Sequence, residues 1–146
     1  MDEILIRPLF PSDLAAAAEI EATAQDAWSK EQILDELCSD AGRLFVAQVG
    51  LQVAGLAIFQ LAAGEASLYA ITIDPAMRRK GLGRRLLQES LESLQKEGAE
   101  SCYLEVRAQN HAAQNLYIDR GFQRTGLRQG FYKNPADDAV LMQYRF

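Results

Sequence analysis

Short runs of apolar residues, many of them β-branched, recur along the chain and predict seven β-strands. Gly50-Leu51-Gln52 separates two of these runs, which predicts a hairpin, and Pro75 ends a third. In another run, Cys102, Leu104 and Val106 share one side. The expected strands cover residues 4–8, 43–49, 53–61, 66–73, 101–107, 122–126 and 139–144.

Helical spacing of apolar residues predicts four helices between and before these strands. The first is rich in alanine, has Ser12 as its expected N-cap, and extends to about Ala24. The third covers residues 84–96 and places three leucines on one face. The fourth follows Asn110 as its N-cap and stops at Gly121.

The second helix carries the most specific start signal. Ser29 and Gln32 have the spacing of a capping box, in which each side chain bonds the backbone amide of the other residue. Trp28 and Ile33 flank this box at the two positions of a hydrophobic staple. We therefore expect a short helix immediately after Ser29.

The order of these elements is β-α-α-β-β-β-α-β-α-β-β, which indicates an α/β domain with a mixed sheet. The helix at 84–96 connects two strands that should be parallel, and the hairpins on either side add antiparallel strands. We find no internal repeat and no linker. Residues 1–146 are therefore expected to form one domain.

Composition and charge exclude several classes of protein. Of the 146 residues, 49% are hydrophobic and 24% are charged, which excludes a disordered chain. The formal net charge of −5 argues against a general nucleic-acid binder, which would usually be basic. An acidic surface is either a simple solvated exterior or a surface that attracts a basic partner such as a cationic peptide.

Cysteine and histidine content argues against a metal centre. Cys38 and Cys102 form neither a disulfide framework nor a zinc-ligand spacing, and His111 is the sole histidine. The N-terminal residues are acidic and strand-like rather than those of a signal peptide, and no apolar run approaches 18 residues. We therefore expect a cytoplasmic protein with reduced thiols, no bound metal and no membrane association.

Residues 71–87 run from an expected strand into a basic, glycine-bearing loop that opens a helix. Helix N-termini present unpaired amides and a positive dipole end, so this segment suits a phosphate or pyrophosphate. The loop lacks the features of a Walker A motif or a dinucleotide fingerprint. A glycine turn with a solvated basic patch is the alternative. The loop cations and glycines are Arg78, Arg79, Lys80, Gly81, Gly83 and Arg84.

The loop sequence Arg78-Arg79-Lys80-Gly81-Leu82-Gly83 resembles the coenzyme A pyrophosphate motif of the GCN5-related N-acetyltransferase (GNAT) family. The resemblance covers nearly the whole chain. Within the family, the RimI-type ribosomal-protein-alanine acetyltransferases are the most similar branch. The segments that support this likeness are Ala27-Trp28-Ser29, Leu104-Glu105-Val106-Arg107-Ala108-Gln109-Asn110, Asn115-Leu116-Tyr117, Gly121-Phe122, Phe131-Tyr132 and Asp138-Ala139-Val140-Leu141-Met142.

This resemblance implies a GNAT fold, with a splayed pair of parallel strands and about four flanking helices, and acetyl-CoA as co-substrate. The loop from Arg78 to Arg84, including Leu82, is expected to hold the pyrophosphate. The backbone of Ile71, Thr72 and Ile73 should bind the pantetheine arm, because a splayed strand leaves amides for a ligand. Asn110 should also bond that arm, in a role compatible with its capping position.

The resemblance further implies that Glu105 is the general base and that Tyr117 is the general acid, besides contacting the coenzyme. A carboxylate in an apolar strand is costly unless it faces a cleft, is paired or is functional. A salt bridge to Arg107 or an exposed sheet position is the alternative for Glu105. A buried aromatic residue beside Leu116 is the alternative for Tyr117.

The acceptor that the resemblance implies is a protein N-terminus, specifically the alanine N-terminus of a small-subunit ribosomal protein. An α-amino group has a pKa of roughly 7.7–8.0, against about 10.4 for lysine, so a modest base suffices for it. Trp28, Ser29, Phe131 and Tyr132 are the expected acceptor-binding residues, although Trp28 also fits a staple. Residues 133–137 form a shorter loop than is usual in this branch, which leaves the exact acceptor open.

Two other functions fit the same sequence. One is acetylation of a small amine or of several protein N-termini, and the other is a non-catalytic acetyl-CoA-binding module. We expect a monomer or weak dimer without direct nucleic-acid binding.

The basic loop hides how acidic the rest of the chain is. Without Arg85 and the four loop cations, 10 of the 15 cations remain against 20 acidic residues, which gives a net charge of −10. The remaining surface is therefore acidic enough to attract a basic protein tail.

Overall fold

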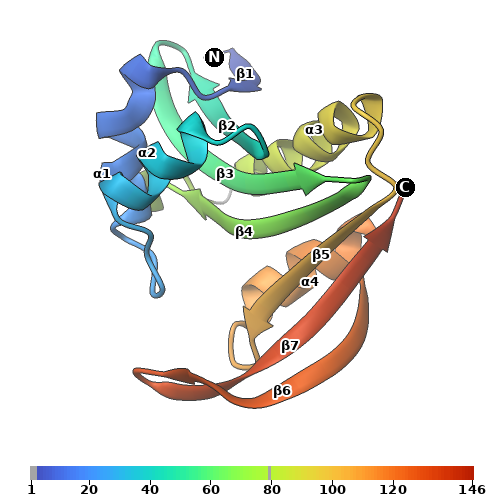
Figure 1. Ribbon diagram of the computed structural model, residues 1–146. Coiled ribbons are helices and arrows are strands. Elements are labelled where there is room, and N and C mark those ends of the chain that lie inside the picture. The colour runs from blue at the N-terminus through green and yellow to red at the C-terminus, as the bar shows by residue number, and fades with distance from the viewer. Residues whose placement is uncertain (1–2, 79) are drawn as a thin grey trace.

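The computed structural model describes residues 3–78 and 80–146, so Arg79 of the expected pyrophosphate loop lies outside the described residues. Within them, seven strands form one mixed sheet in the order β1-β2-β3-β4-β5-β7-β6 (Figure 1). Only β4 and β5 pair in parallel among these described strands. The strands are β1 (Ile4–Pro8), β2 (Gly42–Val49), β3 (Gln52–Ala62), β4 (Glu65–Ile73), β5 (Ser101–Arg107), β6 (Gln123–Lys133) and β7 (Ala136–Arg145).

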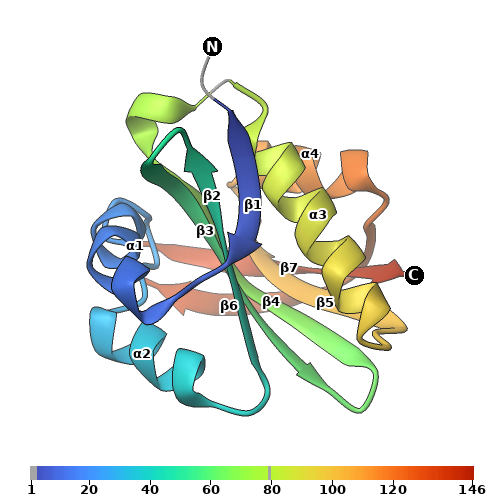
Figure 2. The same cartoon turned by 90° about the horizontal axis from the view of Figure 1, so that it is seen from above.

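Helices cover both faces of the sheet. Figure 2 shows α1 (Leu14–Glu21) and α2 (Lys30–Cys38) on one side and α3 (Leu82–Lys96) on the other, the side on which α4 (His111–Arg120) packs beside α3. Strands β2 and β3 are buried on both faces because they lie between these layers. In the part of the chain that the structure describes, no helix has the length and apolar character needed to cross a membrane.

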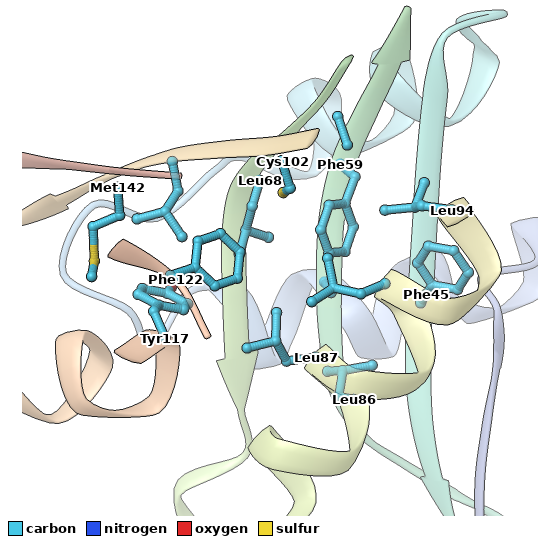
Figure 3. Packing of buried hydrophobic residues seen from close by; sticks show 14 of the residues in the cluster. Phe45, Phe59, Leu68, Leu86, Leu87, Leu94, Cys102, Tyr117, Phe122 and Met142 are labelled. Carbon is cyan, nitrogen blue, oxygen red and sulfur yellow. The ribbon is translucent and has the colours of Figure 1, made fainter. Parts of the chain in front are cut away.

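Alternation along β2 and β3 sends successive side chains to opposite layers. Leu44 and Ile58 pack with the α1 and α2 residues, whereas Phe45 and Phe59 pack with α3. The rings of Phe45 and Phe59 meet edge to face at 5.9 Å. The larger cluster continues from Phe59 through Cys102 to Tyr117 (Figure 3), so one core supports α3, β5 and α4.

The seven strands, the four helices and the parallel pair expected from the sequence are all confirmed. The Ser29 Oγ accepts from the Gln32 amide at 3.1 Å, and the Ser29 amide donates to Gln32 Oε1 at 2.7 Å. Asn110 Oδ1 accepts from the Ala113 amide at 3.1 Å and so caps α4. Gly121 ends α4 with a φ of 113°.

The expected N-cap of the first helix is wrong. The chain enters through a short 3-10 turn, Pro11–Asp13, and Ser12 lies inside that turn rather than at the start of α1. Asp13 holds the turn, because it accepts from the Phe10 amide at 2.7 Å and pairs with Arg7 at 2.7 Å. The same helix ends at Glu21, earlier than its alanine content predicted.

The C-terminal hairpin is longer than the apolar pattern predicted. Most of β6 is exposed, so few of its residues carry a hydrophobic signal. Its pairing with β7 shifts register twice, between Arg124 and Gly126 and between Arg128 and Tyr132, and the hairpin extends to Lys133. The turn that joins β6 to β7 therefore contains Asn134 and Pro135.

The parallel pair divides into a fork. Strands β4 and β5 are in register only from Glu65–Ser101 to Leu68–Leu104, and beyond Leu68 they separate (Figure 1). Residues 70–73 still pair with β3 on their other side. Their backbone groups toward β5 consequently have no strand partner within the described residues. This is the splayed pair of parallel strands that the family resemblance implied.

Candidate functional site

Two grooves border the fork, and we name them by their neighbouring elements. The α3 groove lies between the end of β4 and the starts of α3 and α4. The β5 groove lies over the open side of β5 and has a volume of about 610 Å³. The α3 groove is lined by residues 23–25, 71–73, 77, 78, 81–84, 110, 112, 113 and 116. The β5 groove is lined by residues 26, 28, 67–69, 103–105, 125, 131, 132, 141 and 142.

The loop between α1 and α2 contributes to both grooves. Residues 23–25 line the α3 groove, whereas Asp26 and Trp28 line the β5 groove. Nine of the residues expected to bind the coenzyme meet along the α3 groove: Ile71, Thr72, Ile73, Arg78, Gly81, Leu82, Gly83, Arg84 and Asn110. Sequence patterns had placed these residues on three separate segments, and the fold brings them together.

The start of α3 has the geometry of an anion site. Gly81 is the N-cap, its φ of +74° is in the left-handed region, and no side chain caps the helix. The first-turn amides are therefore left for solvent or a ligand. Apart from its chain neighbours, no atom of the described residues lies within 4 Å of where a Gly81 Cβ would stand, so the left-handed backbone conformation is the reason for glycine at this position.

Substitution of Gly81 by valine should therefore weaken acetyl-CoA binding by about tenfold or more, because a β-branched residue resists the left-handed conformation at a cost of roughly 1–2 kcal/mol and moves the loop. Gly98 provides a matched control at the other end of α3, since it has a φ of +98° and equally open surroundings. Calorimetric titration should show weaker binding in Gly81→Val only. Equal affinity in the two variants would contradict the assignment of this loop.

The basic cluster of the loop is partly neutralised by neighbours. Arg84 lines the groove but is ion-paired with Asp119 of α4. Arg85 bonds Glu89 one turn further along the helix at 2.9 Å. Arg78 is exposed along the groove, and Lys80 is exposed without lining it. Among the loop cations that the structure describes, less positive charge is thus free for an anion than the sequence suggested.

Glu105 stands on the arm of the fork opposite the end of β4. It follows Leu104, the last β5 residue paired with β4, and its side chain faces the β5 groove. The expected alternative of a salt bridge to Arg107 is wrong, because Arg107 pairs with Asp26, whereas Arg128 Nη1 lies 3.4 Å from Glu105 Oε1. Both side chains of this ion pair are exposed to solvent, so the pair is weak. The Glu105 carboxylate is therefore available to an incoming group.

Aromatic side chains form the walls of the β5 groove. Trp28 lies against Tyr69 with ring centres 5.6 Å apart, and Phe131 meets Tyr132 edge to face at 5.0 Å. Three of the four expected acceptor-binding residues therefore line the groove together. Ser29 does not line it, since its hydroxyl and amide are used in the capping box of α2.

Tyr117 is buried in the core with only 7% of its surface exposed, and it lines neither groove. Its ring packs against Phe122 at 5.7 Å, within the cluster that also contains Met142 (Figure 3). Its neighbour Leu116 lines the α3 groove, and Met142 lines the β5 groove. Burial raises the pKa of the Tyr117 hydroxyl, which therefore stays protonated across the physiological range.

Glu21 is a buried carboxylate that the sequence reasoning missed. It is 1% exposed, and it accepts from Thr72 Oγ1 at 2.6 Å and from the Trp28 amide at 2.9 Å. It thereby ties the loop of the β5 groove to the strand of the α3 groove. Burial raises the pKa of Glu21 despite these two hydrogen bonds.

This raised pKa predicts how stability depends on pH. The folded state holds the Glu21 proton more tightly than the unfolded state, so the stability due to protonation is complete below the ordinary value of 4.5 and is lost as pH rises through the folded pKa. Glu21→Gln keeps an acceptor for the Trp28 amide and a donor for Thr72, and should remove this loss. Urea unfolding at several pH values should show the wild type falling relative to Glu21→Gln.

Glu21→Ala is the informative companion variant. It leaves the Trp28 amide and the Thr72 hydroxyl without their partner, at a cost of about 1–3 kcal/mol for each buried group. The same unfolding measurement should therefore show a large loss of stability at every pH. A Glu21→Ala protein as stable as Glu21→Gln would contradict the buried role described here.

The two cysteines are free thiols, of which Cys102 is buried and Cys38 is exposed. Burial raises the pKa of the Cys102 thiol to about 12, so it remains protonated in the core. Among residues 3–78 and 80–146, no three histidine, cysteine, aspartate or glutamate side chains gather in a way that could hold a metal ion.

Known proteins share this fold and sequence. The acetyltransferase (GNAT) family profile matches residues 9–122. Ribosomal protein bS18-alanine N-acetyltransferase of Escherichia coli K12 is 36% identical over 140 residues, which cover 94% of each chain. The N-alpha-acetyltransferase RimI of Mycobacterium tuberculosis is 34% identical over 149 residues, covering 97% of this chain and 92% of that protein.

Solved structures agree with these sequence matches. The crystal structure of the S18-alanine N-acetyltransferase from E. coli superposes with a TM-score of 0.91 at 34% identity, covering 98% of this chain and 94% of the other. Ard1 from Thermoplasma volcanium superposes with a TM-score of 0.87 at 25% identity, covering 97% of each chain. The protein therefore belongs to the acetyltransferase (GNAT) family and is an acetyl-CoA-dependent N-acetyltransferase similar to the RimI-type enzymes.

Proposed function

We propose that this chain acts as one domain that transfers an acetyl group from acetyl-CoA to the α-amino group of a protein N-terminus. The acceptor that we infer is the alanine N-terminus of a small-subunit ribosomal protein in the cytoplasm. The observation that carries the proposal is the fork between β4 and β5. It sets the backbone edge of residues 71–73 that has no strand partner along one groove and the carboxylate of Glu105 in the other.

The α3 groove fits the donor. Its glycine-capped helix start suits a pyrophosphate, and the exposed edge of residues 71–73 suits the amide-bearing pantetheine arm. Leu116 and Ile73 offer apolar surface between these polar ends. Acetyl-CoA would thus be bound by Arg78, the amides of 82–84, the backbone of 71–73 and Asn110, with Lys80 contributing charge nearby.

The β5 groove fits the acceptor chain. Its volume accommodates several residues of an extended peptide, and Trp28, Phe131 and Tyr132 provide apolar walls. We place Ser29 behind this wall as a cap for α2 rather than at the acceptor. The overall charge of −5 favours the approach of a basic tail to the molecule.

The proposed reaction is direct attack of the amine on the thioester carbonyl. A nitrogen–carbon bond forms, the carbon–sulfur bond breaks, and the sulfur leaves with its electron pair. Glu105 takes the amine proton, directly or through one water, and Tyr117 gives its proton to the leaving thiolate. Holding both reactants across the fork supplies much of the rate enhancement by orientation alone.

A panel of short acceptors tests this function. The purified protein is incubated with acetyl-CoA and peptides that begin with alanine, serine, methionine or glycine, with spermidine as the small-amine alternative. We expect coenzyme A release with the alanine peptide and little with spermidine. Release with spermidine alone would contradict an N-terminal acceptor, and tight acetyl-CoA binding without any release would favour a binding module.

A further inference from the structure

Arg107 is an unusual residue for its position. It ends β5 on the side of the strand that Tyr103 and Glu105 expose, yet only 5% of its surface is accessible. Burial of a guanidinium costs several kcal/mol unless the charge is paired and its hydrogen bonds are satisfied. The contacts that bury Arg107 therefore need an explanation beyond the strand itself.

Arg107 makes contacts with two loops that are distant in sequence. Its Nε donates to Asp26 Oδ2 at 2.8 Å and its Nη2 donates to Asp26 Oδ1 at 2.9 Å. This bidentate pair joins two residues that are 81 positions apart in the sequence. Its Nη1 donates to the Pro135 carbonyl at 2.8 Å, and its guanidinium lies 4.3 Å from the centre of the Tyr132 ring. The planar guanidinium is thus engaged along its edge and on its face.

The segments that Arg107 joins form two walls of the β5 groove. Asp26 and Trp28 of the loop between α1 and α2 line one wall, and Tyr132 of β6, which lies two residues before the turn that contains Pro135, lines the other. Figure 1 shows the tip of the first loop directed toward the β6–β7 hairpin. Neither wall is part of the strand that carries Glu105, so their distance from that carboxylate depends on contacts such as these.

We propose that Arg107 is a positioning residue that holds both walls of the β5 groove at a fixed distance from each other and from Glu105. This inference rests on the proposed function only in calling the groove the acceptor site. The clasp formed by Arg107, Asp26 and Pro135 pre-organises the groove, so less ordering is needed when an acceptor binds. Loss of the clasp widens the β5 groove. Residues 23–25, which line the α3 groove, are still held next to β4 by the hydrogen bond between Thr72 Oγ1 and Glu21 at 2.6 Å, so the donor side keeps its shape.

The test uses a signal built into the chain, because Trp28 is its sole tryptophan. Its ring lies in the wall that Asp26 anchors, so its emission and acrylamide quenching report the position of that wall directly. Arg107→Met keeps the length and removes the charge, Arg107→Lys keeps the charge without the fork of donors, and Asp26→Asn weakens one end. The Arg107→Met/Asp26→Asn double variant measures whether the two residues act together.

Arg43→Met is the matched control. Arg43 also pairs with a carboxylate, because its Nε donates to both carboxylate oxygens of Glu97 at 3.0 Å, and its Nη1 donates to the carbonyls of Asp40 and Gly42 at 2.8 Å, but it lies outside both grooves. Its replacement removes a comparable arginine network and lowers stability without moving the groove walls. Changes shared by Arg43→Met and Arg107→Met therefore report stability alone.

In Arg107→Met we expect red-shifted, more quenchable Trp28 emission and a peptide KM raised on the order of 10- to 100-fold, with the acetyl-CoA KM within about twofold of wild type. Arg107→Lys should give Trp28 emission and a peptide KM between those of wild type and Arg107→Met. The double variant should raise the peptide KM no further than Arg107→Met does. Wild-type fluorescence and peptide KM in folded Arg107→Met, or equal changes in Arg43→Met, would overturn the proposal. If the wild type acetylates no peptide, the proposed function fails, but Trp28 fluorescence alone still decides the role of Arg107. If Arg107→Met does not fold, Arg107→Lys and Asp26→Asn supply the same readouts.

Discussion

Tyr117→Phe should lower kcat by about 100-fold with the best peptide acceptor and change acetyl-CoA affinity by less than about twofold. The substitution removes one oxygen from a ring that is 7% exposed and packed against Phe122, so the fold and the α3 groove are preserved. What disappears is the proton that we assign to the leaving thiolate. Steady-state kinetics and calorimetric titration of acetyl-CoA together separate these effects.

The pH profile adds a second check on Tyr117. Burial raises the pKa of this hydroxyl above its ordinary value of 10.0, and an acid acts only while it is protonated. The wild-type rate should therefore show no decline attributable to Tyr117 as the pH rises toward 10. Tyr144→Phe is the control, because Tyr144 contacts the same Phe122 ring at 5.3 Å. Turnover at the wild-type rate in Tyr117→Phe would remove this residue as the acid.

Glu105→Gln should reduce peptide acetylation by about 100-fold near pH 7 and by progressively less above pH 8. An α-amine with a pKa of roughly 7.7–8.0 is mostly protonated at the lower pH, so a base matters most there. The exposed contact with Arg128 at 3.4 Å contributes little stability, so the variant should remain folded. Rates measured from pH 6 to about 9 provide the comparison.

Glu100→Gln is the control for the carboxylate, because Glu100 is exposed and immediately precedes β5, at the end away from Glu105. It should show the wild-type profile. A Glu105→Gln profile that runs parallel to wild type at all pH values would indicate an electrostatic or structural contribution, and it would count against Glu105 as the base.

The regular elements could be predicted because their signals are local. The capping box at Ser29, the cap at Asn110 and the stop at Gly121 each depend on a few adjacent residues, and all three are present. The prediction of Ser12 as an N-cap was wrong because Asp13, which is bonded to Arg7 of β1, accepts from the Phe10 amide and holds a 3-10 turn there instead. The exposed half of β6 carries no apolar periodicity, so its length could not be read from the chain.

The site shows the same division. The basic loop and its glycines are contiguous, and the residues along the α3 groove followed from that motif. Glu21, Asp26 and Arg107 were missed because their partners lie 51 and 81 residues away, where no spacing rule applies. Arg107 illustrates the limit, since its place on β5 pointed to Glu105 while its actual partner is in the loop between α1 and α2.

The central claim is that the acceptor nitrogen is a protein α-amine, and a single peptide tests it most directly. The peptide begins with alanine and contains one internal lysine, so both kinds of amine are present at equal concentration. After incubation with acetyl-CoA and wild-type protein, fragmentation in a mass spectrometer locates the acetyl group. We predict acetylation of the α-amine alone, and acetylation of the lysine, or of both amines equally, would contradict the account.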